Sequence, residues 1–306
     1  MPGVLQLDDG LLFFPVTAFD RRGGLNLDAY RQHVRDRLAA GPTAIFAACG
    51  TGEFFSLDLD EFTACVEVAV QESAGRVPVI AGTGYGGPLA RRFADAAAVA
   101  GADGLLAMPP YLVVGSQDGL RAHYRDLADH SSLDLIIYQR DNVVFTPETV
   151  VDLAGHPRIA GFKDGLGDLD LMRRIVGAVR VAHGEGALRY FNGMPTAEMT
   201  AQAYGAVGVP LYSSAVFCFA PDLAMAFQRA FASGDHETAD RLLDGFWRPY
   251  VELRRRGAGY AVSLVKAGVV LDGLDVGPVR APLSQPAAEH VAELAKLIES
   301  GRKLLS

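Results

Sequence analysis

Residues 77–108 read VPVIAGTGYGGPLARRFADAAAVAGADGLLAM and hold one complete strand–helix–strand unit. Two short apolar runs, 77–82 and 103–108, flank an alanine-rich segment at 88–100 that has the pattern of an amphipathic helix. A strand, a helix and a second strand in this order predict two parallel strands joined by a crossover helix.

The same alternation runs from Leu11 to about residue 212. The eight candidate strands are LLFFPVTAF (11–19), TAIFAA (43–48), VPVIAG (77–82), DGLLAM (103–108), LDLIIYQ (133–139), RIAGFK (158–163), ALRYFN (187–192) and GVPLYS (208–213). Helical segments follow them, and their expected starts are Ser56/Asp58, Pro88, Thr146–Pro147 and Asp168. Eight such units over roughly 200 residues favour an α/β fold of the (β/α)8 (TIM) barrel type over an open sheet.

After the eighth strand only helical patterns remain. They are PDLAMAFQRAFASG, DHETADRLLDGFWRPYVELRRR, YAVSLVKAGVVLDG and PAAEHVAELAKLIESG, within residues 221–306. The first would supply the eighth barrel helix. The predicted organisation is therefore a barrel over residues 1–233 and a C-terminal helical extension over residues 234–306.

The composition, with 50% hydrophobic and 21% charged residues, is typical of a globular protein. The net charge is −8, and no dense basic run provides the stripe that a nucleic-acid partner requires. The short clusters Arg91–Arg92 and Arg254–Arg256 are interpreted as solvated helix faces.

No apolar run approaches the ~20 residues needed to span a bilayer, so no membrane partner is expected. The first residues lack the basic segment and apolar core of a signal peptide. Cys49, Cys65 and Cys218 have no metal-type spacing and are interpreted as reduced thiols. The predicted location is the cytoplasm.

The stretch GTGYGG, residues 82–87, matches the glycine fingerprint of dinucleotide-binding proteins. That site needs an acidic residue at the end of the following strand, but this strand ends in Met108–Pro109, and Asp103 stands at its beginning. A tight loop at the end of the third barrel strand explains the glycines equally well, and without that acidic residue the dinucleotide site is not favoured. The seven histidines are scattered, and no cofactor or metal site is predicted.

Reactive groups follow three of the predicted strands. They lie in ACGTGEFFSL (48–57), IIYQRDN (136–142) and GFKDGLGD (161–168). Residues at the carboxyl ends of barrel strands point into the active-site mouth. Tyr138 and Lys163 fall on adjacent strands, which lie only ~4.8 Å apart, so their side chains are expected to meet.

These groups suit the chemistry of an α-keto acid. A lysine amine in a partly apolar pocket has a lowered pKa and can condense with a ketone, while Tyr138 shuttles protons and Thr51 relays a proton to it. The backbone N–H groups of the Gly50–Gly52 turn suit a carboxylate. Taken alone, a lysine at a strand end is more often a surface or salt-bridged residue, and Asp164 is an adjacent partner for Lys163. Cys49 is an alternative nucleophile without an evident histidine.

The stretches CGTGEFFSL, IIYQRDN, GFKDGLGD, FNGMPTAEM and SSAVFCFAP resemble the N-acetylneuraminate lyase/dihydrodipicolinate synthase family. Its members are class I, Schiff-base (β/α)8 enzymes, and the similarity covers essentially the whole chain. By position, the resemblance implies that Lys163 is the Schiff-base lysine, Tyr138 the proton-transfer tyrosine, and Thr51 a carboxylate-binding and relay residue. It also implies a homo-oligomer, either a tetramer or a dimer.

Within the family, the resemblance implies dehydration and decarboxylation of the sugar acid 5-dehydro-4-deoxy-D-glucarate to 2,5-dioxopentanoate. Three departures argue against dihydrodipicolinate synthesis. Gly50 replaces the first hydroxyl residue of the usual loop, and Leu112 replaces a second tyrosine. Arg140 follows Tyr138 by two residues, where synthases carry an arginine slightly farther on.

A dicarboxylic substrate needs polar groups at its distal end. Arg140, Asn192, Ser213 and Ser214 are interpreted as these groups, because strand-end positions face the mouth. Loss of Arg140 is expected to raise KM for the dicarboxylate more than for simple 2-keto acids. Two alternatives stay open: a pyruvate-releasing aldolase that acts on a 2-keto-3-deoxy sugar acid, and a non-catalytic barrel that binds a small molecule.

Overall fold

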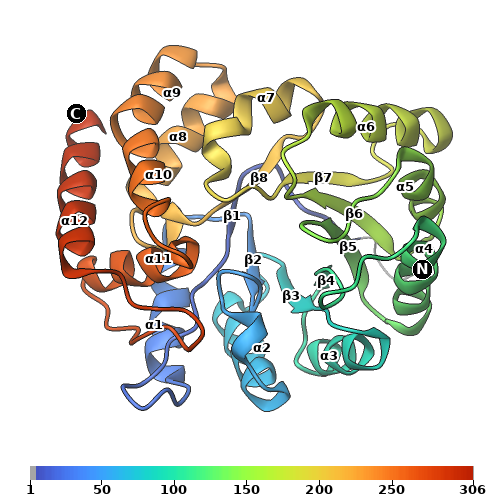
Figure 1. Cartoon of the computed structure of the whole chain (residues 1–306), viewed down its shortest axis with the longest axis horizontal. Helices are drawn as coiled ribbons and strands as arrows, with labels where there is room; N and C mark the ends of the chain where they lie inside the picture. The colour runs from blue at the N-terminus through green and yellow to red at the C-terminus, as the bar shows by residue number, and fades with distance from the viewer. Residues whose placement is uncertain (1–4, 306) are drawn as a thin grey trace.

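The computed structural model describes residues 5–305, in which eight parallel strands form a closed barrel in sequence order (Figure 1). The strands are β1 (Leu11–Phe13), β2 (Ala44–Ala47), β3 (Val79–Thr83), β4 (Gly104–Ala107), β5 (Asp134–Gln139), β6 (Ile159–Asp164), β7 (Arg189–Asn192) and β8 (Leu211–Ser214). Pairing of β1 with β8 closes the barrel, so the predicted fold is confirmed.

The barrel helices cover the outside of the sheet. They are α1 (Leu27–Leu38), α2 (Leu59–Ser73), α3 (Gly87–Val99), α4 (Gln117–His130), α5 (Pro147–Ala154), α6 (Leu169–His183), α7 (Ala201–Ala206) and α8 (Pro221–Ser233). Asp58, Thr146 and Asp168 cap α2, α5 and α6 as predicted, each accepting a backbone hydrogen bond from the first turn. Ser56 instead ends a 3-10 helix, η1 (Phe54–Ser56).

Strand β1 is shorter than the apolar run that predicted it. It ends at Phe13, two residues before Pro15. Proline has no N–H to donate to a neighbouring strand, so the ladder cannot continue through that position. The rest of the run, up to Phe19, is buried as loop.

Alternating side chains of each strand point to opposite sides of the sheet. Leu12, Phe46, Ile136, Phe191 and Leu211 belong to a cluster that fills the barrel interior. The residues between them pack in a second, larger cluster against the helices. Because burial of one such side chain is worth ~1.5–3 kcal/mol, the alternation strongly specifies which residues face the barrel axis.

The C-terminal helices lie together at the left of Figure 1, beside the barrel. They are α9 (His236–Leu242), a π-helical segment η4 (Leu243–Trp247), α10 (Arg248–Arg254), α11 (Tyr260–Leu271) and α12 (Ala288–Arg302). Short 3-10 helices occur at η2 (Ala197–Thr200), η3 (Val216–Cys218) and η5 (Lys303–Leu305). The π-helical segment interrupts the single helix predicted over 235–256, just before Pro249, which lacks an N–H.

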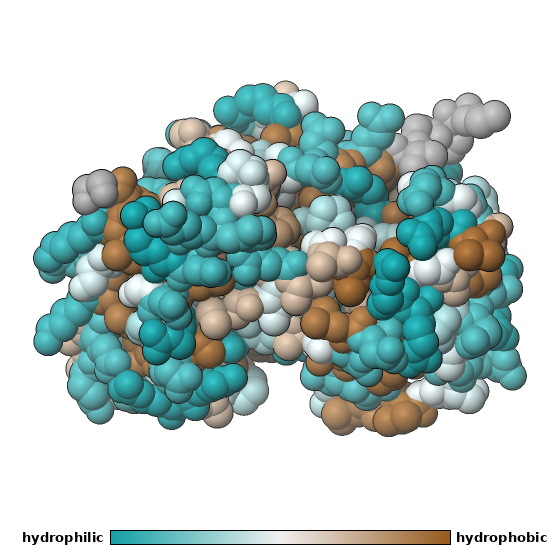
Figure 2. Space-filling view, turned by 90° about the horizontal axis from the view of Figure 1, so that it is seen from above, coloured by the Kyte–Doolittle hydropathy of each residue, from teal (hydrophilic) through white to brown (hydrophobic). Residues whose placement is uncertain are grey.

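Seen from above, the surface is mostly hydrophilic, with scattered apolar groups and a hollow between two lobes (Figure 2). No helix within residues 5–305 has the length and hydropathy needed to cross a membrane. Over the same residues, no group of three or more histidine, cysteine or acidic side chains is arranged to hold a metal ion. The three cysteines are buried and unpaired.

Candidate active site

A cavity of about 620 Å³ opens at the carboxyl ends of the barrel strands. Six of the residues predicted for the site line it: Gly50, Thr51, Tyr138, Arg140, Lys163 and Ser213. A cavity of about 690 Å³ beside α8 and α9 is larger, but its lining carries no lysine, cysteine or tyrosine. The strand-end cavity is therefore the candidate active site.

Lys163 is buried in the floor of this cavity, with 5% of its surface exposed. Its Nζ lies 4.1 Å from the ring centre of Phe14 and 4.8 Å from that of Tyr138. Burial lowers the pKa of this amine from 10.5 to about 7, and the positive charge of Arg140 lowers it further. Lys163 makes no ion pair with a carboxylate among residues 5–305, so a large share of the amine is free near neutral pH.

Asp164, the alternative partner for Lys163, faces the other side of the sheet. Its carboxylate accepts hydrogen bonds from Gln139 Nε2, from the Tyr204 hydroxyl and from the amides of Leu166 and Gly167. These contacts fix the turn after β6. The interpretation of Lys163 as a salt-bridged surface lysine is therefore wrong.

Tyr138 is the register partner of Lys163 on the adjacent strand. Its hydroxyl donates a hydrogen bond to the Gly193 carbonyl (3.1 Å), and no hydrogen bond links it to Thr51 in the part of the chain that the structure describes. Burial raises the pKa of this phenol above its usual range, while Arg140 acts in the opposite direction. The phenol is thus protonated at neutral pH and lies beside the lysine.

The turn Gly50–Gly52 leads into the 3-10 helix η1, with α2 beginning only at Leu59. Gly50 and Thr51 line the cavity, and their amides donate to no acceptor within residues 5–305. Gly52 does not line it: its carbonyl accepts a hydrogen bond from Thr17 Oγ1 (2.6 Å), which fixes the turn. The predicted contact of Gly52 with substrate is therefore corrected to a role in the loop.

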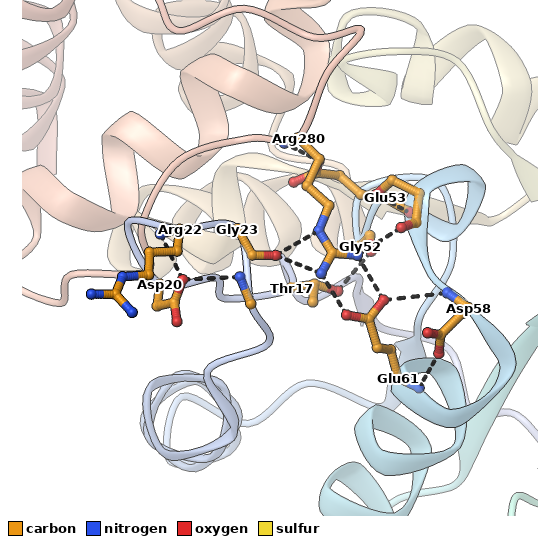
Figure 3. Close-up of polar contacts among 11 residues, drawn as sticks. Thr17, Asp20, Arg22, Gly23, Gly52, Glu53, Asp58, Glu61 and Arg280 are labelled. Carbon is orange, nitrogen blue, oxygen red and sulfur yellow. Dashed lines mark hydrogen bonds and ion pairs between the residues drawn. The ribbon is translucent and has the colours of Figure 1, made fainter.

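Glu53, the residue after this turn, ties it to the C-terminal helices (Figure 3). Its carboxylate accepts from Lys266 Nζ of α11 (3.0 Å) and from the Arg280 amide (3.0 Å). Both Glu53 and Lys266 are fully buried. Arg280 in turn donates to the Gly23 carbonyl and to Glu61 in α2. The extension thereby fixes the position of the candidate carboxylate-binding loop.

Asn192 and Ser214 are strand-end residues that do not reach the cavity. Asn192 Nδ2 donates to the Ala197 carbonyl and to Thr200, and Ser214 Oγ donates to Glu198 (2.5 Å). Both side chains are fully buried on the helix side of the sheet. The prediction placed them at the mouth, which is wrong because strand neighbours alternate and only one of Ser213 and Ser214 can face inward.

Sequence reasoning missed several residues of the cavity wall. Phe14 and Gly193 come from the loops after β1 and β7, and Tyr250 and Arg254 come from α10. Arg254 was predicted to lie on a solvated helix face, but its side chain is half-buried and its Nε is fully buried. The pattern of charges in the sequence does not predict that Arg254 packs against the cavity.

The structure also explains the two alternative sites that the sequence suggested, the glycine stretch GTGYGG and the thiol of Cys49. A Cβ at Gly82, the first glycine of GTGYGG, would lie 2.5 Å from the carbonyl oxygen of Ala48, so this glycine permits close contact between β3 and the residue that follows β2. Cys49 is fully buried in the barrel interior, and burial raises the pKa of its thiol to about 12. A thiol with this pKa is a poor nucleophile at neutral pH.

Comparison with known proteins agrees with the fold. The model of the dihydrodipicolinate synthetase family matches residues 8–301. A Streptomyces coelicolor protein named "Probable 5-dehydro-4-deoxyglucarate dehydratase 1" is 62% identical over 98% of this chain and 95% of its own length. A Paracidovorax citrulli protein named "Probable 5-dehydro-4-deoxyglucarate dehydratase" is 46% identical over 96% and 95%.

Among solved structures, a dihydrodipicolinate synthase from Bacillus anthracis is 25% identical. It superposes with a TM-score of 0.86 over 96% of this chain and 99% of its own. The matched family model, the relatives and the shared architecture agree over nearly the whole chain. The chain therefore belongs to the dihydrodipicolinate synthetase family.

Proposed function

We propose that the protein dehydrates and decarboxylates 5-dehydro-4-deoxy-D-glucarate to 2,5-dioxopentanoate, CO2 and water through a Schiff base on Lys163. The observation that carries this proposal is a buried amine with a lowered pKa and no carboxylate partner, next to a phenol, in a cavity at the strand ends. The names of the relatives at 62% and 46% identity support this reaction within the family. Residues 1–233 form the catalytic barrel in this proposal, and residues 234–306 form its helical extension.

The first step is attack of the free Lys163 amine on the ketone. Water leaves and an iminium forms, with Tyr138 donating the proton that the departing hydroxyl requires. The carboxylate beside the ketone is bound by the unused amides of Gly50 and Thr51. In this proposal the Thr51 hydroxyl lies at the same end of the substrate and relays protons to Tyr138 once substrate is bound, since no hydrogen bond links the two side chains directly within residues 5–305.

The iminium withdraws electrons from the adjacent methylene, which loses a proton to Tyr138. The β-hydroxyl then leaves as water and a conjugated iminium remains. Electrons of the bond to the distal carboxyl group pass through this conjugated system to the iminium nitrogen, and neutral CO2 leaves. Protonation and hydrolysis release the product and free Lys163 for the next turnover. Arg140 and Ser213 line the cavity and contact the polar distal half in this proposal.

The proposal includes a cytoplasmic homo-oligomer, either a tetramer or a dimer. Three buried, unpaired cysteines support a reducing compartment. The segment Tyr111–Val114 at the cavity rim exposes four large apolar side chains in succession, as is typical of an interface. Light scattering should report more than one chain, and Val113→Asp with Val114→Asp should reduce the assembled fraction.

The direct test traps the iminium with borohydride in the presence of 5-dehydro-4-deoxyglucarate, with mass spectrometry of the peptides and a parallel assay of CO2. The expected result is a reduced adduct on the Lys163 peptide together with CO2. Lys266 is a matched internal control, because it is also buried but is held by Glu53 and is absent from the cavity lining. Its peptide should stay unmodified.

Other outcomes identify the alternatives. An adduct accompanied by pyruvate and an aldehyde, without CO2, would favour an aldolase. Absence of an adduct with any 2-keto acid would reject Schiff-base chemistry and leave a binding protein.

A further inference from the structure

Arg254 ends helix α10 in the C-terminal extension and forms part of the cavity wall. Tyr250, one helical turn earlier, and Ala261 and Val262 of α11 lie in the same wall. The extension thus brings a guanidinium group to a cavity whose reactive lysine comes from β6. Among the described residues, Arg254 is one of four charged side chains that line the cavity, together with Arg140, Asp141 and Lys163.

The Arg254 side chain has no protein partner that neutralises it. Its buried Nε donates to no acceptor in the described part of the chain, and no carboxylate pairs with its guanidinium there. The next two arginines are exposed and paired: Arg255 with Glu252 (3.4 Å) and Arg256 with Glu293 (2.7 Å). A half-buried guanidinium without a counter-ion is costly, and an anionic ligand that pairs with its terminal nitrogens from the cavity would reduce that cost.

Arg140, the other arginine of the cavity, already forms an ion pair with a carboxylate of the protein. Its Nε donates to Asp141 (3.1 Å), and its side chain is 43% exposed. Its charge acts on Tyr138 and Lys163, lowering the pKa of both. The two guanidinium groups of the cavity therefore have different surroundings: Arg140 is left to contact the hydroxyl groups of the distal half, and Arg254 is the one without a carboxylate partner within residues 5–305.

We propose that Arg254 is a specificity-determining residue that binds the distal carboxylate of the substrate. The proposal rests on the proposed function, in which the other carboxylate is held at Gly50–Thr51. A guanidinium offers two parallel N–H donors to a carboxylate, and a paired geometry of this kind discriminates a diacid from a monoacid. A second carboxylate would find no other unpaired arginine in this cavity.

The distal carboxyl group carries a negative charge when it binds and leaves as neutral CO2. An ion pair with Arg254 therefore stabilises the bound substrate more than the transition state of decarboxylation. Loss of Arg254 should therefore raise KM strongly without lowering kcat. A residue that only supported the fold would affect stability and the binding of all substrates alike.

The test compares two probes of equal chain length, 2-oxoadipate and 2-oxohexanoate, which differ only in the distal carboxylate. Both form a borohydride-trappable adduct with Lys163, so the ratio of their half-saturation concentrations reports the distal contact without any turnover. Arg254→Gln should reduce the preference of the wild type for 2-oxoadipate by roughly 10- to 100-fold. Arg254→Lys, which keeps the charge but not the paired donors, should lie between them.

Arg255→Gln is the matched control, because Arg255 is on the same helix but is exposed and absent from the cavity lining. It should behave as wild type with both probes. An unchanged preference in Arg254→Gln would overturn the proposal, as would an equal loss for both probes. If Arg254→Gln does not fold, an unchanged preference in Arg254→Lys would overturn it. If the wild type binds 2-oxoadipate through Arg254 but releases no CO2 from 5-dehydro-4-deoxyglucarate, only the proposed function fails.

Discussion

Tyr138 and Lys163 are paired residues of two adjacent parallel strands, and the lysine nitrogen lies 4.8 Å from the centre of the tyrosine ring. The backbone ladder of β5 and β6 sets this relationship, so it does not depend on a flexible loop. From this one position the phenol can therefore exchange protons with the lysine nitrogen and with the substrate atom bonded to that nitrogen.

Tyr138→Phe should lower kcat by about 100- to 1,000-fold, since it removes the proton shuttle while leaving the ring in place. Adduct formation with pyruvate should be slowed but still detectable by mass spectrometry. Tyr212→Phe is the control, because Tyr212 is a buried strand tyrosine that does not line the cavity. Activity of Tyr138→Phe close to that of Tyr212→Phe would exclude the phenol from proton transfer.

The rate of adduct formation with pyruvate should rise with pH and level off above about 7, because only the free amine attacks and the pKa of Lys163 is about 7. Arg140→Gln removes a positive charge that lowers this pKa. Its profile should therefore shift to higher pH. A stopped-flow or quenched borohydride assay across neutrality measures both midpoints, and a shift to lower pH in the variant would contradict the electrostatic account.

Lys163→Met should abolish turnover and yet stabilise the fold by on the order of 1 kcal/mol at neutral pH. Folding lowers the pKa of this amine from 10.5 to about 7. Burying it is therefore unfavourable below about pH 7, and the penalty fades as pH rises toward 10.5. Thermal unfolding at several pH values should show a gain in Tm that shrinks with pH. A loss of Tm at every pH would mean that the lysine stabilises the barrel.

Gly193→Ala should disturb the position of the reactive amine. A Cβ there would lie 2.6 Å from Lys163 Cε and 2.9 Å from the Asp164 carbonyl oxygen, so the lysine must move. Misplacement of a reacting group by about 1 Å can cost about 100-fold in rate. Gly86→Ala is the control, because Gly86 has extended backbone and no atom within 4 Å of a new Cβ. Equal kcat in the two variants would show that the site tolerates the displacement.

Lys266→Met should destabilise the protein by about 3–5 kcal/mol, because it leaves the Glu53 carboxylate buried without its cation. Glu53→Gln combined with Lys266→Met should recover part of the loss. Arg174→Met, which breaks an exposed pair with Asp170, should cost less than about 1 kcal/mol. Denaturant unfolding measures all three. A double variant as unstable as Lys266→Met would show that packing, and not charge, dominates at this position.

Local pattern predicted the barrel well, since each strand is an apolar run and the helix starts carry their own capping residues, such as Asp58 and Thr146. Lys163 and Tyr138 were found because a strand end has one defined position in a closed barrel. Asn192 and Ser214 were misplaced because the strand-end rule was applied without regard to alternation. Arg254 could not be found in this way, since its position depends on how a later helix packs over the cavity.

The ion pair of Glu53 with Lys266, together with the Arg280 amide, also has a consequence for synthesis on the ribosome. The loop that carries Thr51 can form its last hydrogen bonds only after residue 280 has left the ribosome. Lys163 and Tyr138 are synthesised much earlier. A nascent barrel would therefore hold its reactive amine beside an unfinished substrate loop. Chains that stop before Lys266 should fold in part but remain unable to orient a keto acid.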